Sequence, residues 1–252
     1  MILNYDFQKN SVKNDAQTLV FIHGLFGSLS NLGMLARAFV ESHHVLQLDV
    51  RNHGKSAHDS AMNYELMAED VLATLDHLGI ENFIVIGHSM GGKISMKLAE
   101  LAPNRLEKLV VLDMAPIAST QRNHDQIFEA LFAVENAQID SRQDALSIMR
   151  THLKEEMVIQ FLMKSFNKGH WLFNVKSLYE NYSNIMAWEN MQSDVPAIFI
   201  RGGVSPYLAH AAQQDAVYAQ FQNAVIKTVD GAGHWLHAEK TNEVLEHIQS
   251  FI

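Results

Sequence analysis

The chain contains no cysteine and few basic residues for its size, and both shortages narrow its possible functions. Without cysteine there can be no disulfide, thiolate metal site or cysteine nucleophile. Lys and Arg number 19 against 28 Asp and Glu, so the formal net charge is −9. Nucleic acids and anionic membrane surfaces select basic patches, so this charge argues against both as partners.

Long apolar runs are also missing. No run approaches the ~20 apolar residues that a membrane-spanning helix needs. Residues 1–10 lack the basic stretch and apolar run of a secretory signal. These absences predict a cytoplasmic protein without a membrane span. A chain of 252 residues suits one sizeable domain with a small insertion, and a core of that size is stable without crosslinks.

Short apolar runs alternate with longer amphipathic segments along most of the chain. Near-continuous Val, Ile, Leu and Phe predict buried parallel strands, and residues 2–7 could add an edge strand. Strands alternating with helices favour an α/β fold, a mostly parallel sheet flanked by helices. The expected strands are Thr18–Ile22, Val45–Val50, Phe83–Ile86, Leu109–Leu112, Ala197–Ile200 and Val225–Val229, and the expected helices are Asn31–Glu41, Tyr64–Leu78, Met90–Leu101 and one from Glu239 towards Phe251.

The alternation breaks between residues 117 and 191, where the pattern predicts helices and no strand. Ser141 and Asp144 form a capping-box-like start for one of these helices. An ordinary crossover between strands needs only one helix. The segment 117–191 is therefore predicted to be a helical cap inserted into a core of residues 1–116 and 192–252. The alternative is that its helices simply cover the sheet. The expected helices are Arg122–Glu135, Ala145–His152 and Glu155–Phe166.

The motif G-H-S-M-G at residues 87–91 lies between a predicted strand and a predicted helix. This is the pattern of a nucleophile elbow, a sharp strained turn that exposes a serine hydroxyl at the end of a strand. Ser89 is therefore the candidate nucleophile. The N–H of Met90, at the start of the following helix, can face a developing oxyanion. The alternative is an ordinary tight turn.

The motif H-G-L-F-G at residues 23–27 follows the strand expected at 18–22. Its first glycine lets the chain turn beneath a substrate and present a backbone N–H. We expect Leu25 to supply this second oxyanion donor, with Phe26 as the alternative, and the Phe26 side chain is a candidate substrate contact. One such donor is worth about 2.7–4 kcal/mol of transition-state stabilisation. The alternative is an ordinary strand-to-loop turn.

One of the 14 histidines stands out by its position. His234 follows G-A-G in the loop after the last predicted strand, and the order nucleophile, acid, histidine makes it the candidate base. Trp235 is a candidate substrate contact. A metal pair formed with His237 is disfavoured because no carboxylate or third-ligand pattern accompanies it. The sequence thus predicts neither a metal nor a cofactor.

Together these motifs resemble those of α/β-hydrolase serine esterases. H-G-x-x-G at 23–27, D-V-R-N-H-G-K-S at 49–56, G-H-S-M-G-G at 87–92 and G-A-G-H-W at 231–235 are similar to the bacterial YbfF-like esterase group and to the abhydrolase-11 proteins. The resemblance spans essentially the whole chain. It implies an α/β-hydrolase fold that hydrolyses carboxylic-ester or acyl-thioester bonds under a helical cap, without a cofactor. By its own residues, segment 49–56 is expected to be a rigid, self-bonded turn.

The third member of the triad departs from the common pattern. Most relatives place the acid after the strand matching 197–200, where this chain has Ser205. Serine cannot carry a charge beside an imidazolium. Asp113 ends the neighbouring predicted strand, and a parallel sheet would bring it to the same edge as Ser89, so Asp113 is the candidate acid. The alternatives are that Asp113 only caps the next turn, that Asp215 or Asp230 serves, or that water completes a dyad.

The leading hypothesis is a serine esterase or thioesterase that forms an acyl-enzyme on Ser89 with a small-molecule ester or thioester. One rival is a carbon–carbon bond hydrolase or MenH-like lyase, in which Arg51, Lys93 or Arg122 would recognise an acidic substrate. The other is a catalytically quiet ligand-binding module. No pattern indicates an oligomeric state. Aromatic residues in the insertion either line an acyl site or pack against one another: Phe128, Phe132, Phe161, Phe166, Trp171, Phe173 and Trp188.

Overall fold

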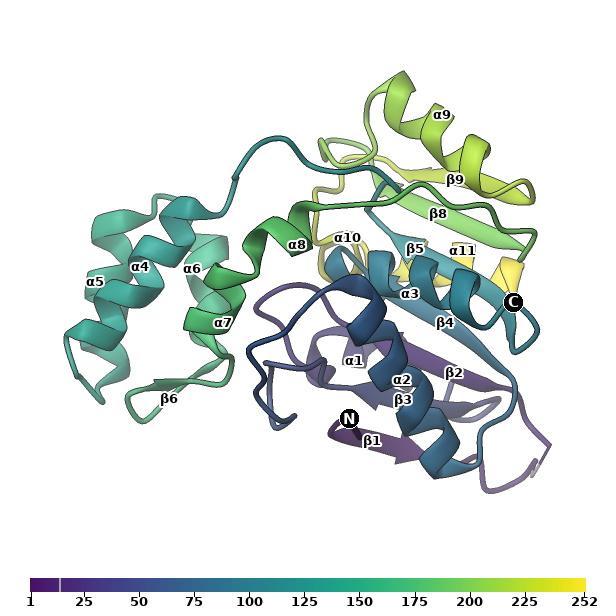
Figure 1. Cartoon of the computed structure of the whole chain (residues 1–252), viewed down its shortest axis with the longest axis horizontal. Helices are drawn as coiled ribbons and strands as arrows, with labels where there is room; N and C mark the ends of the chain where they lie inside the picture. Colours follow the sequence, from purple (N-terminus) through teal and green to yellow (C-terminus); the bar gives the residue numbers. More distant parts are fainter. Residues whose placement is uncertain (14) are drawn as a thin grey trace.

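A mostly parallel sheet forms the centre of the protein (Figure 1). The structure, a computed structural model, describes residues 1–13 and 15–252. The strand order is β1-β3-β2-β4-β5-β8-β9, and every neighbouring pair is parallel except β1 with β3, so the expected edge strand is the antiparallel one. The strands are β1 (Tyr5–Gln8), β2 (Thr18–Ile22), β3 (His44–Leu48), β4 (Phe83–His88), β5 (Leu106–Leu112), β8 (Ala197–Gly202) and β9 (Ala224–Val229).

Helices cover both faces of this sheet, which explains why its strands are apolar on both sides. Leu109 and Val111 of β5 pack in the cluster that contains α2 (Tyr64–Leu78) and α3 (Met90–Leu101). Val110 and Leu112 pack in the opposite cluster, with side chains of α1 and α11. The remaining helices of the core are η1 (Leu29–Leu32), α1 (Gly33–Arg37), α9 (Ala211–Gln220), α10 (Leu236–Glu239) and α11 (Thr241–Phe251). No helix in the described part of the chain is long and apolar enough to cross a bilayer.

Between β5 and β8 the chain leaves the sheet and forms a separate group of helices beside it (Figure 1). The Ser141 side chain accepts the Asp144 N–H at the start of α5, as the capping pattern predicts. This group comprises α4 (Asp125–Asn136), α5 (Arg142–His152), α6 (Glu156–Met163), α7 (Val175–Glu180) and α8 (Tyr182–Met186).

The expectation that this segment contains no strand is wrong. β6 (Phe166–Asn167) pairs antiparallel with β7 (His170–Trp171) in a short hairpin. Its turn places Lys168 at φ 46° and Gly169 at φ 83°, and positive values at both central residues are typical of tight hairpin turns. Strands of two residues are too short to show an alternating pattern in the sequence.

Polar side chains attach the inserted helices to the core. The Tyr64 hydroxyl donates to the Ile185 carbonyl oxygen at 2.6 Å, and the Asn184 amide donates to the Met62 carbonyl oxygen at 3.0 Å. The Gln220 amide contacts both connections: it donates to the Pro116 carbonyl oxygen at 2.7 Å and accepts from the Trp188 indole N–H at 2.9 Å. The entering and leaving segments are therefore held together on the core.

Candidate active site

Three of the predicted residues meet at the carboxyl edge of the sheet. Ser89 follows β4, Asp113 follows β5, and His234 lies between β9 and α10. His234 Nε2 lies 3.0 Å from Ser89 Oγ, and His234 Nδ1 lies 2.6 Å from Asp113 Oδ2. The Asp113 side chain is fully buried, whereas that of His234 is 18% exposed. The three side chains therefore form a continuous chain of hydrogen bonds that ends at an accessible imidazole.

The glycines around Ser89 are required by close backbone contacts. Ser89 has φ 55° and ψ −117°, a strained conformation for a residue with a side chain. A Cβ atom on Gly87 would lie 2.2 Å from the Gly91 carbonyl oxygen, and one on Gly91 would lie 2.2 Å from the Ile22 carbonyl oxygen. A side chain at Gly87 would therefore displace the first turn of α3, and one at Gly91 would push the β4–α3 turn away from β2.

The Asp113 carboxylate is oriented by further donors. Its Oδ1 accepts the Gly202 N–H at 2.9 Å, and its Oδ2 accepts the Ser205 hydroxyl as well as His234. Ser205 thus lies where most relatives carry the acid, and its hydroxyl contacts the carboxylate of Asp113, the candidate acid of this chain. Among the described residues, the carboxylate that contacts the His234 imidazole is that of Asp113. Among these same residues, no contact is found between His234 and the alternative acids Asp215 and Asp230.

These partners define which ring nitrogen of His234 carries the proton. Because Nδ1 faces a carboxylate, it carries the proton, which leaves Nε2 free to accept from the Ser89 hydroxyl. Two neighbours that the sequence did not reveal hold the residue further. The Tyr207 ring stacks on the imidazole at 4.1 Å, and His88 Nε2–H donates to the His234 carbonyl oxygen at 2.8 Å.

The predicted oxyanion donors differ in what they contact. The Phe26 N–H, the alternative donor, is engaged with His53 Nε2 at 3.1 Å. Within residues 1–13 and 15–252, no hydrogen-bond acceptor is found for the N–H of Leu25 or Met90. Both belong to segments beside the nucleophile: Met90 follows Ser89 in the chain, and Leu25 follows Gly24, where a Cβ atom would lie 3.2 Å from Ser89 Cβ.

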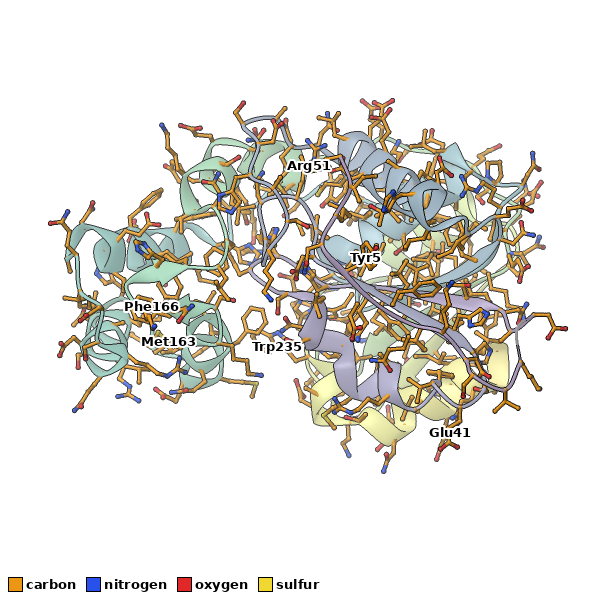
Figure 2. All side chains as sticks on the ribbon, turned by 90° about the horizontal axis from the view of Figure 1, so that it is seen from below. Tyr5, Glu41, Arg51, Met163, Phe166 and Trp235 are labelled. Carbon is orange, nitrogen blue, oxygen red and sulfur yellow. The ribbon has the colours of Figure 1, made fainter. Side chains whose placement is uncertain are left out.

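The two candidate substrate contacts have different surroundings. Phe26 is 2% exposed and its ring packs between Phe128 and Phe173, each at 5.3 Å. Trp235 projects from the core towards the inserted helices (Figure 2), and its ring lies 5.8 Å from that of Phe161 in α6. Most of the other aromatic residues of the insertion are buried and pack against one another, Phe166 with Trp171 at 5.2 Å for example.

The cations proposed for acidic substrates already have protein partners. Arg51 is buried and pairs with Asp70 at 2.6 Å. Lys93 donates to the Ala187 carbonyl oxygen at 3.3 Å, and burial lowers its pKa to about 8. Arg122 pairs with Asp125 at 2.9 Å. In the described part of the chain, no group of three or more His, Asp or Glu side chains could hold a metal ion.

A group of buried or half-buried histidines surrounds the site, and each is held neutral. Desolvation by burial lowers the pKa of His53 and His237 to about 3 and that of His124 to about 4. Burial also lowers the pKa of His23 and places that of His88 well below its ordinary value. The folded protein therefore resists protonation at all these rings.

This resistance predicts that acid destabilises the fold. An unfolded histidine titrates near ~6.5, so the stabilisation is fully present above that pH and is lost as pH falls towards the folded pKa of about 3 to 4. Each such histidine removes about 1.4 kcal/mol per pH unit in this window. We expect urea unfolding measured from pH 7 to pH 5 to show uptake of at least about two protons on unfolding. A free energy of unfolding that is constant over this range would contradict the prediction.

Comparison with known proteins finds relatives over the whole length of the chain. A family model for the alpha/beta hydrolase fold matches residues 17–241. The chain is 47% identical over 253 residues to Esterase YbfF of Escherichia coli (strain K12), a match that covers 100% of this chain and 99% of the relative. It is 34% identical over 247 residues to the sn-1-specific diacylglycerol lipase ABHD11 of Mus musculus, covering 93% and 80%.

A solved structure is similar to this chain over its whole length. A marine microorganism esterase superposes with a TM-score of 0.92 at 30% sequence identity, and the match covers 100% of this chain and 99% of that one. The resemblance inferred from the motifs is therefore confirmed, and so is the predicted fold class. The chain belongs to the α/β-hydrolase family.

Proposed function

We propose that this protein is a serine esterase that cleaves carboxylic-ester or acyl-thioester bonds through an acyl-enzyme on Ser89. The observation that carries the proposal is the chain of hydrogen bonds from Ser89 Oγ through His234 to Asp113, at 3.0 and 2.6 Å. Relatives that match more than nine-tenths of this chain are named as an esterase and a lipase, which supports the same reaction class. No cofactor is needed for this chemistry.

The first half of the reaction transfers the acyl group to the enzyme. Ser89 Oγ attacks the carbonyl carbon while His234 Nε2 takes the hydroxyl proton. Asp113 stabilises the imidazolium that forms. The N–H groups of Leu25 and Met90 receive the negative oxygen of the tetrahedral intermediate. When this intermediate collapses, the bond to the leaving alcohol or thiol breaks and the leaving group takes the proton from His234.

The second half regenerates the enzyme. The oxygen of a water molecule attacks the acyl carbon, and His234, which is neutral again, takes a proton from that water molecule. The new tetrahedral intermediate uses the same backbone donors. Its collapse breaks the ester bond to Ser89, releases the carboxylic acid and returns the proton from His234 to Ser89 Oγ.

Segment 117–191 is proposed to act as a cap over the core formed by residues 1–116 and 192–252. Trp235 of the core and Phe161 of α6 contact each other across the two parts, beside His234. These rings are suited to an apolar acyl chain. Phe26 is proposed to support the 23–27 loop and not to contact the acyl chain, because its N–H is bonded to His53 and its ring is buried against Phe128 of the insertion.

The rival hypotheses are less well supported. A carbon–carbon bond hydrolase or MenH-like lyase would need a free cation for an acidic substrate, whereas Arg51 and Lys93 are buried and Arg122 is paired. A catalytically inactive binding module would not need the strained conformation of Ser89, which costs free energy to maintain.

The proposal is tested with p-nitrophenyl esters of increasing acyl length beside the corresponding acyl-CoA thioesters, with Ser89→Ala as the blank. We expect hydrolysis of medium or long acyl esters above the blank, since the aromatic pair can hold an apolar chain. The ratio of kcat/KM between the two series assigns ester or thioester preference. If the folded protein hydrolyses no ester or thioester, the proposal fails, and labelling by a fluorophosphonate then distinguishes an unreactive Ser89 from an unsuitable substrate.

A further inference from the structure

The loop at residues 49–56 does more than bond to itself. His53 in this loop is fully buried beneath the 23–27 loop. Its Nδ1 lies 2.9 Å from the Arg51 carbonyl oxygen, so Nδ1 carries a proton and donates it. Its Nε2 accepts the Phe26 N–H at 3.1 Å. Both nitrogens are therefore in use, and burial lowers the pKa of His53 to about 3, which keeps the ring in this neutral form.

Phe26 needs such a restraint because its backbone is strained. Its φ of 62° lies in the left-handed region, which is unfavourable for a bulky residue. His53 holds the N–H of Phe26, and the Ser165 hydroxyl donates to its carbonyl oxygen at 3.3 Å. Phe128 and Phe173 hold its ring. The N–H, the carbonyl oxygen and the ring of Phe26 are therefore all held, and together these contacts maintain the strained conformation.

We propose that His53 is a positioning residue that fixes the backbone of Phe26 and thereby directs the neighbouring Leu25 N–H at the oxyanion. The inference rests on the proposed function, because it assigns a purpose to the oxyanion donor. With Phe26 N–H bound to His53, the next amide back along the chain, that of Leu25, is left free for a substrate. The same loop passes beside Ser89, since a Cβ atom added to Gly24 would lie 3.2 Å from Ser89 Cβ.

The arrangement also joins the oxyanion loop to the inserted helices. His53 forms an isolated antiparallel bridge with Phe173, and the Asn174 N–H donates to the Asn52 carbonyl oxygen at 2.8 Å. Ser165 and Phe173, which both hold Phe26, belong to the insertion. The position of the insertion is therefore transmitted to the Leu25 N–H through Phe26. Shifting the insertion away would release the restraint.

A matched pair of amide variants tests the proposal. In His53→Gln the amide can reach the Phe26 N–H, whereas in His53→Asn the shorter amide can bond only near the Arg51 carbonyl oxygen. We expect His53→Asn to lower kcat about 10²-fold, as removal of one oxyanion donor does, with KM changed less than about twofold because the donor acts only in the transition state. His53→Gln should recover at least about tenfold of that loss.

Affinity for a tetrahedral analogue separates positioning from mere loss of structure. An alkyl trifluoromethyl ketone forms an oxyanion on Ser89, so its affinity should fall in His53→Asn in parallel with kcat/KM. Ser193→Ala is the matched control: it removes a buried acceptor of a backbone N–H, that of Val195 at 3.2 Å, in the segment before β8. This control should lose stability but keep kcat and analogue affinity.

The outcomes separate this inference from the proposed function. If Ser89→Ala is inactive while folded His53→Asn keeps wild-type kcat and analogue affinity, only the positioning role is refuted. If Ser89→Ala stays active, the proposed function itself fails. Should His53→Asn not fold, Ser165→Ala decides, because it removes the hydroxyl that holds the Phe26 carbonyl. We expect it to lower kcat and analogue affinity about two- to tenfold, and wild-type values for both would overturn the inference.

Discussion

Replacing Ser89 with alanine is expected to lower ester hydrolysis by about 10⁶-fold, the size of effect seen when the nucleophile of another serine hydrolase is removed. Without Oγ there is no acyl-enzyme, and His234 Nε2 loses the hydroxyl that lies 3.0 Å from it. The fold should survive. Alanine has the same Cβ as serine, so the strained φ of 55° becomes no less favourable.

The measurement compares hydrolysis rates and thermal unfolding of the variant and the wild type. Ser193→Ala is a suitable control, because Ser193 is buried and its hydroxyl accepts the Val195 N–H, remote from the site. The control should keep both its activity and its labelling by a fluorophosphonate, and Ser89→Ala should lose both. A variant that retains a tenth of the wild-type rate would show that Ser89 is not the nucleophile.

Elements with strong local signals could be predicted to the residue. The helix α2 was expected at Tyr64–Leu78 and is found there. Its ends are marked by local chemistry: the Asn63 side chain accepts the Leu66 N–H, and Gly79 adopts φ 69°. The helix expected at Asn31–Glu41 is instead the short pair η1 and α1, which begins with a capping box of Ser28 and Asn31 but ends at Arg37 without a left-handed cap.

The candidate triad could be predicted because it depends on strand ends. In a parallel sheet, residues that follow neighbouring strands meet at one edge, and Asp113 and Ser89 do so. Other parts of the site could not be predicted in this way. Tyr207 on His234 and His53 beneath Phe26 are contacts between loops, and their geometry depends on packing between segments far apart in sequence. The 49–56 loop was expected only to bond to itself, which it does through Asp49 and Lys55.

The expected effect of Asp113→Asn is a loss of kcat of about 10⁴-fold with KM nearly unchanged. The carboxylate stabilises the imidazolium only as it forms, so substrate binding in the ground state should not change. An amide at this position can also favour the wrong tautomer of His234. Asparagine tolerates the left-handed φ of 52° found at residue 113, so the backbone should keep its shape. Asp230→Asn, at an alternative acid that does not contact His234, serves as the control and should keep wild-type kcat.

Ser205 allows a sharper test, because its hydroxyl donates to the same Asp113 oxygen that contacts His234. Ser205→Asp in the Asp113→Asn background would place a carboxylate at the end of β8 instead of β5. We expect this double variant to regain about 10- to 100-fold of the lost kcat, since a carboxylate there can again orient the imidazole. Ser205→Asp alone should be slower than the wild type, because it would set two carboxylates side by side in a buried site. Rescue in one background and damage in the other would show that both strand ends reach the same imidazole. A fully active Asp113→Asn protein would instead mean that His234 is oriented by another group, and Asp113 would be left with a purely structural role.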